Sequence, residues 1–360
     1  MKILTNNVEI GTWYRKELEG GISSNGKSYN ITFKKGTTNK LLVFFVGGGF
    51  SWNEETASKP ITVSSTLRKK EAFYVREIPL WQLPLIHVGI LNTKDNRNPF
   101  SDWHILTIPY STADFHIGNN EYPYTDAKGN NKVIHHKGAN NIKKALKVLK
   151  KLVPETPDNL VIAGTSAGGY GCVAHSPQIK NLYPDCKNIL VYADSSYLKS
   201  PLWPNIAKEV WKVSDDLKPY IKSDDLMTDL FHYANSRMPS HTVFLHFCSV
   251  GDAEIVKFMN KMNHEKLSID SKTLQAFYDD LTHAVGKLKK EIPNYHYFLT
   301  DHGKDPKNGT TPHTFVATAK LFYGKIQAGM SIANWLTQAC EGKPLDIGIE
   351  FVENNTSTPE

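Results

Sequence analysis

The sequence predicts an α/β protein, in which helices cover both faces of a mainly parallel β-sheet. Two observations lead to this class. Short runs rich in β-branched and aromatic residues alternate along the chain with longer segments of helical periodicity, as in strands joined by helical crossovers. One run, residues 160–163, passes through Gly164 straight into a segment of small residues, which indicates a tight turn from a buried strand into a helix.

In chain order, the first elements are an edge hairpin and loops in residues 1–38, where glycines separate short apolar pieces. Strands are predicted at residues 41–46, 104–109, 160–163, 189–193, 242–250 and 295–299, and helices at 142–152, after 166, from 253, at 272–292 and at 330–340. Residues 54–100 and 199–240 are expected to be insertions near the functional site, the first loop-rich and the second helical.

The length and composition suit one large globular unit. We expect residues 1–352 to form a single domain, since 360 residues can bury one large core, and the polar residues 353–360 to form a disordered tail. The chain has 40% apolar and 22% charged residues and no run of eighteen apolar residues, so no membrane span is predicted.

The net charge of +6 has one local concentration, at residues 143–151, where apolar residues recur at helical spacing. These lysines therefore belong to the exposed face of an amphipathic helix, and no nucleic-acid partner is expected. A mild basic excess suits an acidic substrate such as a uronic-acid polymer. The oligomeric state cannot be read from the sequence.

The sequence also carries indications of the compartment. Residues 1–7 turn polar too soon for a signal peptide, and the four widely spaced cysteines include no Cys-x-x-Cys pair. We therefore expect reduced, mostly buried thiols and a cytoplasmic protein, or a secreted one if a leader has been removed.

The central motif is Gly164-Thr165-Ser166-Ala167-Gly168, a Gly-x-Ser-x-Gly pattern between a strand and a helix. In a nucleophile elbow of this kind, the serine hydroxyl projects above the sheet, and the flanking glycines avoid collisions with the neighbouring strand and helix. We predict Ser166 as the nucleophile. The alternatives are an ordinary glycine-rich turn or a phosphate-binding loop, and the second is disfavoured because no lysine follows the glycines.

A second glycine-rich loop follows the strand at 41–46 and contains Gly47, Gly48, Gly49 and Phe50. Glycines directly after a core strand leave backbone N–H groups free to face a ligand, so this loop is a candidate for part of an oxyanion hole. The alternative is a flexible turn.

A serine nucleophile needs a base and an acid, which in hydrolases with this elbow follow in the order Ser, Asp or Glu, His. Asp194 and Asp252 each follow a predicted strand, and His302 and His313 come later. Asp194 could instead form a polar pocket wall, and Asp252 could cap the next helix. The residues alone leave both the acid and the base open.

The sequence contains one candidate metal site. Asp114 and His116 could combine with His135 and His136, but no second carboxylate or cysteine lies at ligand spacing. We therefore predict neither a metal nor a cofactor.

Taken together, these motifs resemble the pectin acetylesterase and Notum family of carboxylesterases. The resemblance rests on segments that occur in the family's order, namely residues 47–53, 109–118, 164–169, 194–195 and 312–314. It covers residues 41 to about 345 and implies an α/β-hydrolase-like fold that hydrolyses an O-linked acyl ester without a metal.

The resemblance also implies roles for individual residues. The nucleophile falls on Ser166, the acid on Asp252 and the base on His313. The oxyanion donors fall on the backbone of Gly48, Gly49 or Phe50 and of Ala167, and we assign Asp114, Asp194 and Ser195 to substrate binding.

One departure concerns disulfides. Secreted members of this family carry cysteines at or near the positions of Ser51, Ser111 and Thr314, and their joint absence fits a compartment in which disulfides do not form.

We therefore expect a serine carboxylesterase that deacetylates a polysaccharide, with an acylated carbohydrate or another ester as its substrate. The alternatives are an esterase for longer acyl chains on lipid or protein, an inactive carbohydrate- or lipid-binding relative, and a peptidase.

Overall fold

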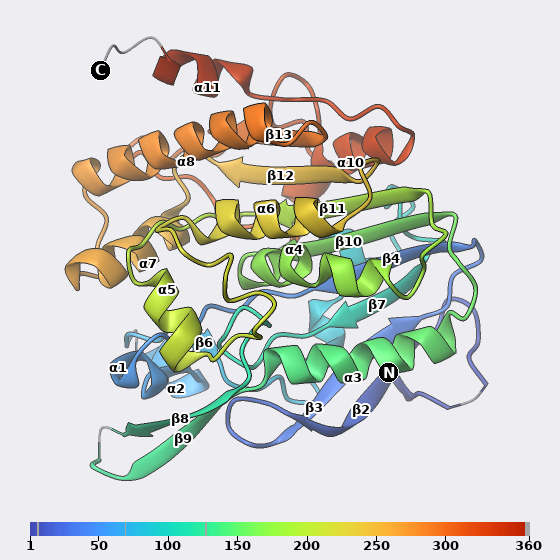
Figure 1. The fold of residues 1–360 in the computed structure, drawn as a ribbon, viewed down its shortest axis with the longest axis horizontal. Coiled ribbons are helices and arrows are strands. Elements are labelled where there is room, and N and C mark those ends of the chain that lie inside the picture. The colour runs from blue at the N-terminus through green and yellow to red at the C-terminus, as the bar shows by residue number, and fades with distance from the viewer. Residues whose placement is uncertain (6, 69, 127, 357–360) are drawn as a thin grey trace.

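The computed structural model describes residues 1–356 except residues 6, 69 and 127, and its centre is a nine-stranded sheet (Figure 1). In sheet order the strands are β1 (Lys2–Ile3), β2 (Trp13–Ile22), β3 (Ser28–Lys34), β7 (His104–Ile108), β4 (Lys40–Phe45), β10 (Asn159–Thr165), β11 (Asn188–Asp194), β12 (Val243–Ser249) and β13 (Tyr295–Thr300). From β7 to β13 all neighbours are parallel, whereas β3 runs antiparallel to β2 and β7. The predicted α/β-hydrolase-like class is confirmed.

Helices cover both faces because successive side chains of a central strand point in opposite directions. In β4, Leu41, Val43 and Phe45 belong to one core, and Leu42 and Phe44 belong to the other. The first core is covered by α3 (Gly138–Leu152), α4 (Ala167–Lys180), α6 (Leu226–Arg237), α7 (Ala253–His264) and α8 (Ser271–Glu291), and the second by η2 (Gly89–Leu91), α9 (Ala319–Tyr323) and α10 (Ile332–Cys340).

The two predicted insertions differ in where they lie. Residues 54–100 form α1 (Glu54–Ala57), β5 (Pro60–Ile61), α2 (Val63–Leu67), β6 (Tyr74–Val75) and η1 (Leu83–Ile86) before η2. Residues 199–240 form α5 (Trp203–Asn205), the π-helical turn η3 (Ile206–Val210) and α6, which packs against α4. Trp203, Trp211 and Phe231 are fully buried, so the aromatic side chains of this insertion belong to the core, where both tryptophans pack against Phe50 and Phe115.

Two further features depart from the sequence prediction. A separate hairpin, β8 (Asn120–Thr125) and β9 (Asn131–His136), projects beyond the sheet and was not predicted (Figure 1). Helix α11 (Ile349–Thr356) includes residues 353–356, which we expected in a disordered tail, because Phe351 and Val352 pack onto the core beside α8. Residues 357–360 lie outside the described part of the chain.

The cysteines match their prediction. All four are free; Cys172, Cys186 and Cys248 are buried and Cys340 is half-buried. In the described part of the chain, no helix combines the length and the apolar character needed to cross a bilayer.

Candidate active site

Ser166 stands on a strained turn between β10 and α4. Its backbone has φ 53° and ψ −126°, a conformation that non-glycine residues rarely adopt. A hydrogen bond of 2.7 Å from the Ser166 amide to the Asp194 carbonyl holds the turn, and the residue stays partly exposed. The strand, the turn and the helix therefore form the predicted elbow, with the hydroxyl accessible.

The two glycines that flank the serine, Gly164 and Gly168, allow the strands and the helix to pack closely at this turn. A Cβ on Gly164 would lie 2.1 Å from the Gly168 carbonyl oxygen, and a Cβ on Gly168 would lie 2.1 Å from that of Phe45. Neither distance is possible for a real side chain, so the helix and the strand would have to separate. This is the collision that the motif predicts.

The glycine loop passes directly beside the elbow. A Cβ on Gly47 would lie 2.7 Å from the Cβ of Ser166, which shows how close the two segments run. Within the described residues, the amides of Gly48 and Gly49 donate to no protein acceptor, and the Ala167 amide belongs to the first turn of α4, where no intrahelical acceptor exists. Three free donors thus lie around the serine.

Phe50 does not fit the donor role that we predicted for it. Its amide donates to the Phe73 carbonyl at 2.9 Å, and the Val75 amide donates to the Gly48 carbonyl at 2.8 Å. These two hydrogen bonds attach the glycine loop to β6 and the residue before it. The side chain of Phe50 lines the pocket instead. The candidate donors are therefore Gly48, Gly49 and Ala167.

His313 and Asp252 form a close pair. The Nδ1 atom of His313 lies 2.7 Å from Oδ2 of Asp252, while Oδ1 of Asp252 accepts the amides of Glu254 and Ile255 at 3.1 Å each. Asp252 is thus both a helix N-cap and the partner of the histidine, so the two alternative roles coexist.

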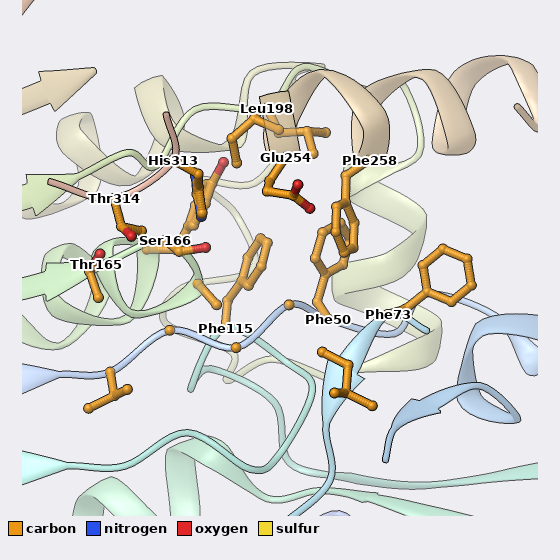
Figure 2. Close-up of a pocket in the computed structure, with 18 of the residues that line it drawn as sticks. Phe50, Phe73, Phe115, Thr165, Ser166, Leu198, Glu254, Phe258, His313 and Thr314 are labelled. Carbon is orange, nitrogen blue, oxygen red and sulfur yellow. The ribbon is translucent and has the colours of Figure 1, made fainter. Parts of the chain in front are cut away.

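Burial lowers the pKa of His313, but the charge of Asp252 and its hydrogen bond outweigh this and leave the pKa above its usual 6.5. The ring of His313 lines the same pocket as Ser166 and points toward that serine (Figure 2). His302, the other candidate base, does not line that pocket, and its amide donates to Thr300 in a separate turn.

Asp194 and Ser195, which we predicted to contact substrate, are buried and do not line the pocket. The Asp194 carboxylate accepts the amides of Phe315 and Val316 at 3.1 and 3.0 Å, and Ser195 Oγ accepts the amide of Thr314 at 3.1 Å. Burial raises the Asp194 pKa to about 6 although these donors oppose the shift. The two residues hold the loop that carries the histidine.

The neighbouring Ser196 completes this support. Its hydroxyl lies 2.7 Å from the Ser166 carbonyl oxygen and 2.9 Å from that of Asp194, so it links the elbow to the end of β11. Sequence reasoning missed this positioning role. The run of polar residues directly after a core strand was the only available signal.

Asp114 is also buried outside the pocket, contrary to its predicted contact with substrate. It accepts the Thr112 hydroxyl at 2.6 Å, the His116 amide at 3.1 Å and the Gly138 amide at 2.8 Å, and burial raises its pKa to about 7. The carboxylate therefore anchors its own loop to α3. No group of three or more His, Cys, Asp or Glu side chains in the described residues could hold a metal.

The pocket beside Ser166 has a volume of about 360 Å³. Its wall is mainly apolar and includes four phenylalanines that pack on one another, namely Phe50, Phe73, Phe115 and Phe258 (Figure 2). Glu254 also lines the pocket; half of its side chain is exposed, and its carboxylate pairs with Lys257. An apolar group could enter this pocket and reach the serine.

A comparison with protein families agrees with this geometry. The family model described as Pectinacetylesterase matches residues 20–201, which is half of the chain. The matched segment includes the glycine loop, the elbow and residues 194–196, and it ends before Asp252 and His313.

Proposed function

Because this chain belongs to the pectinacetylesterase family, and is therefore an ester hydrolase, we propose that it is a serine carboxylesterase that cleaves O-acyl esters with Ser166, His313 and Asp252. One observation carries the proposal. The strained serine and the histidine–aspartate pair, from distant parts of the chain, line or adjoin a single pocket. We also propose that residues 1–352 act as one catalytic domain.

The proposed reaction has two halves. His313 Nε2 takes the proton of Ser166 Oγ as that oxygen attacks the ester carbonyl carbon, and the carbonyl becomes a tetrahedral oxyanion. When the C–O bond to the alcohol breaks, His313 returns the proton to the departing oxygen and an acyl-enzyme remains. Water then repeats the sequence, releasing the carboxylic acid and restoring the Ser166 hydroxyl.

Asp252 and the three backbone amides assist this reaction in different ways. Asp252 keeps the Nδ1 proton of His313 in place, so that Nε2 can accept a proton, and it stabilises the imidazolium that forms. The amides of Gly48, Gly49 and Ala167 are the candidate donors to the oxyanion, and each such donor is worth about 3 kcal/mol of barrier.

The family favours acetyl groups on a polysaccharide as the substrate. The pocket favours a second candidate, a longer acyl chain on a lipid or protein. The pocket wall is mainly apolar and includes four phenylalanines, whereas an acetyl group offers only one methyl group to such a surface. A series of p-nitrophenyl esters from acetate to palmitate separates the two candidates by the chain length at which kcat/KM is greatest.

The direct test is Ser166→Ala. We expect it to abolish hydrolysis of p-nitrophenyl acetate and labelling by a fluorophosphonate probe while leaving the melting temperature nearly unchanged. A mutant as active as the wild type would remove Ser166 from the mechanism. Absence of both activity and labelling in the wild-type protein would favour an inactive binding relative.

We further propose a compartment that keeps thiols reduced, which the four free cysteines support. Thiol titration of the denatured protein, isolated from its native source under alkylating conditions, should find all four cysteines reduced. A disulfide in that material would contradict this proposal.

A further inference from the structure

An exposed apolar patch lies next to the catalytic pocket, on the 54–100 insertion. It comprises Ile61, Leu67, Leu80, Trp81 and Leu85, which are 42%, 79%, 50%, 69% and 64% exposed. Large apolar side chains exposed singly are ordinary, but a group of this kind marks a surface that another apolar phase covers.

The patch draws on two stretches of the chain that meet at one groove. Ile61 and Leu67 line a shallow groove together with Pro79 and Gln82, which flank Leu80 and Trp81 in sequence. Hydrogen bonds from the Gln82 amide to Pro79 and from the Leu85 amide to Gln82 make this second stretch a compact turn. In Figure 1 the underlying elements α2 and β6 lie together at one end of the molecule.

The patch also adjoins the pocket that contains Ser166. Ile61 lines both the groove and the catalytic pocket. Its strand β5 pairs with β6, where Val75 lines the groove, and Phe73, just before β6, lines the pocket. A thin two-stranded ribbon is therefore all that separates the apolar surface from the place where an ester would be cleaved.

The charges around the patch favour an anionic partner. Arg68 directly follows Leu67 and Lys70 comes soon after it; both are exposed, and neither forms an ion pair within the described part of the chain. The nearby acids are already neutralised, since Glu71 pairs with Lys59 at 2.8 Å and Glu77 pairs with Lys27 at 2.8 Å. Apolar side chains beside free cations are the pattern of a surface that lies on anionic lipid.

We propose that this patch docks the protein on an anionic lipid–water interface, from which an ester can pass into the adjoining pocket. A second copy of the chain seated on the patch would stand at the pocket's edge and bring its own Arg68 and Lys70 near those of the first. A lipid surface supplies the apolar contact, the negative charge and the ester together. The docking goes beyond the proposed function, although the delivery of an ester rests on it.

The experiment measures binding separately from catalysis. The full chain and its Ser166→Ala variant are sedimented with vesicles of phosphatidylcholine alone and of phosphatidylcholine mixed with phosphatidylglycerol. We expect both proteins to bind the mixed vesicles equally and the neutral vesicles at least about tenfold more weakly. The double variant L67S/W81S should lose about tenfold or more of its binding, and R68S/K70S should lose the preference for the anionic lipid.

Matched controls come from apolar residues of similar exposure elsewhere. Ile3→Ser and Ile10→Ser, at 62% and 58% exposure, should leave binding unchanged. Trp81 is the most exposed tryptophan, so brominated lipid should quench the fluorescence of the wild type, and Trp81→Phe should remove this quenching while retaining binding. All of these variants except Ser166→Ala should hydrolyse soluble p-nitrophenyl acetate as the wild type does.

The proposal is overturned if the protein does not bind mixed vesicles, or if L67S/W81S binds as tightly as the wild type. A patch variant that changes only the oligomeric state in sedimentation velocity would instead identify a second copy as the occupant. Vesicle binding by Ser166→Ala does not depend on turnover, so failure of the esterase mechanism and failure of the docking surface give different results.

Discussion

Replacing Asp252 by asparagine tests how the histidine is held. One carboxylate oxygen caps α7, and the other lies 2.7 Å from His313 Nδ1. An asparagine can keep the cap with its carbonyl oxygen, which turns its NH₂ group toward the ring. Nδ1 must then be unprotonated, so the neutral ring carries its proton on Nε2, facing Ser166, and cannot accept another.

The size of the effect follows from this tautomer. The same substitution in a Ser-His-Asp triad lowers kcat about 10⁴-fold. Because each factor of ten corresponds to about 1.4 kcal/mol, we expect a loss of about 10³ to 10⁴, or roughly 4 to 5.5 kcal/mol of barrier. The fold should tolerate the change, since asparagine is as good an N-cap as aspartate, whereas Asp252→Ala should lose about 1 kcal/mol of stability with the cap.

The pH profile gives an independent readout. His313 must be neutral to act as a base, and its pKa is raised, so activity of the wild type should rise with pH through a midpoint above 6.5. In Asp252→Asn the burial that lowers this pKa remains while the carboxylate that raises it is gone, so the midpoint of the residual activity should move to lower pH.

The assay is kcat/KM for p-nitrophenyl acetate from pH 5 to 9, with thermal unfolding of the same samples. An Asp252→Asn variant within tenfold of the wild type, or one whose midpoint does not move, would refute the assigned pairing. If the variant unfolds at the assay temperature, its activity is measured at a temperature below its melting transition.

The remaining predictions concern residues around the Asp252–His313 pair. Gly49→Ala should reduce kcat at least about 100-fold, because φ at this position is +73° and a Cβ would lie 1.9 Å from the Phe73 carbonyl oxygen. The control is Gly11→Ala, where φ is +76° but no atom lies within 4 Å of a Cβ; it should cost only about 1 kcal/mol of stability and leave kcat unchanged. Asp194→Ala should lower the free energy of unfolding by about 3 kcal/mol in chemical denaturation, because two buried backbone amides would lose their acceptor, while the exposed Asp215→Ala should change it by less than about 1 kcal/mol. Phe258→Ala should reduce kcat/KM for hexanoate about tenfold more than for acetate in the ester series, and equal losses would show that the side chain does not contact the acyl chain.

The sequence by itself determined the elbow. The geometry of the elbow depends on a strand, the five adjacent residues of the motif and the start of a helix. Gly164 must be a glycine because it packs against Gly168, and Gly168 must be one because it packs against Phe45 on the next strand. The unbroken apolar run at residues 41–46 likewise predicted a buried strand, and the side chains of β4 do enter both cores. Patterns of this kind are local, so they can be read without knowing the fold.

The tertiary structure decided which carboxylate faces which histidine. Asp194 ends β11 and Asp252 follows the end of β12, and chain order alone could not separate them. The difference comes from the loop at residues 310–316, which crosses the end of the sheet and places His313 against Asp252 and its following amides against Asp194. Such contacts join residues 61 and 121 positions apart, so they depend on the order of the strands rather than on any pattern along the chain.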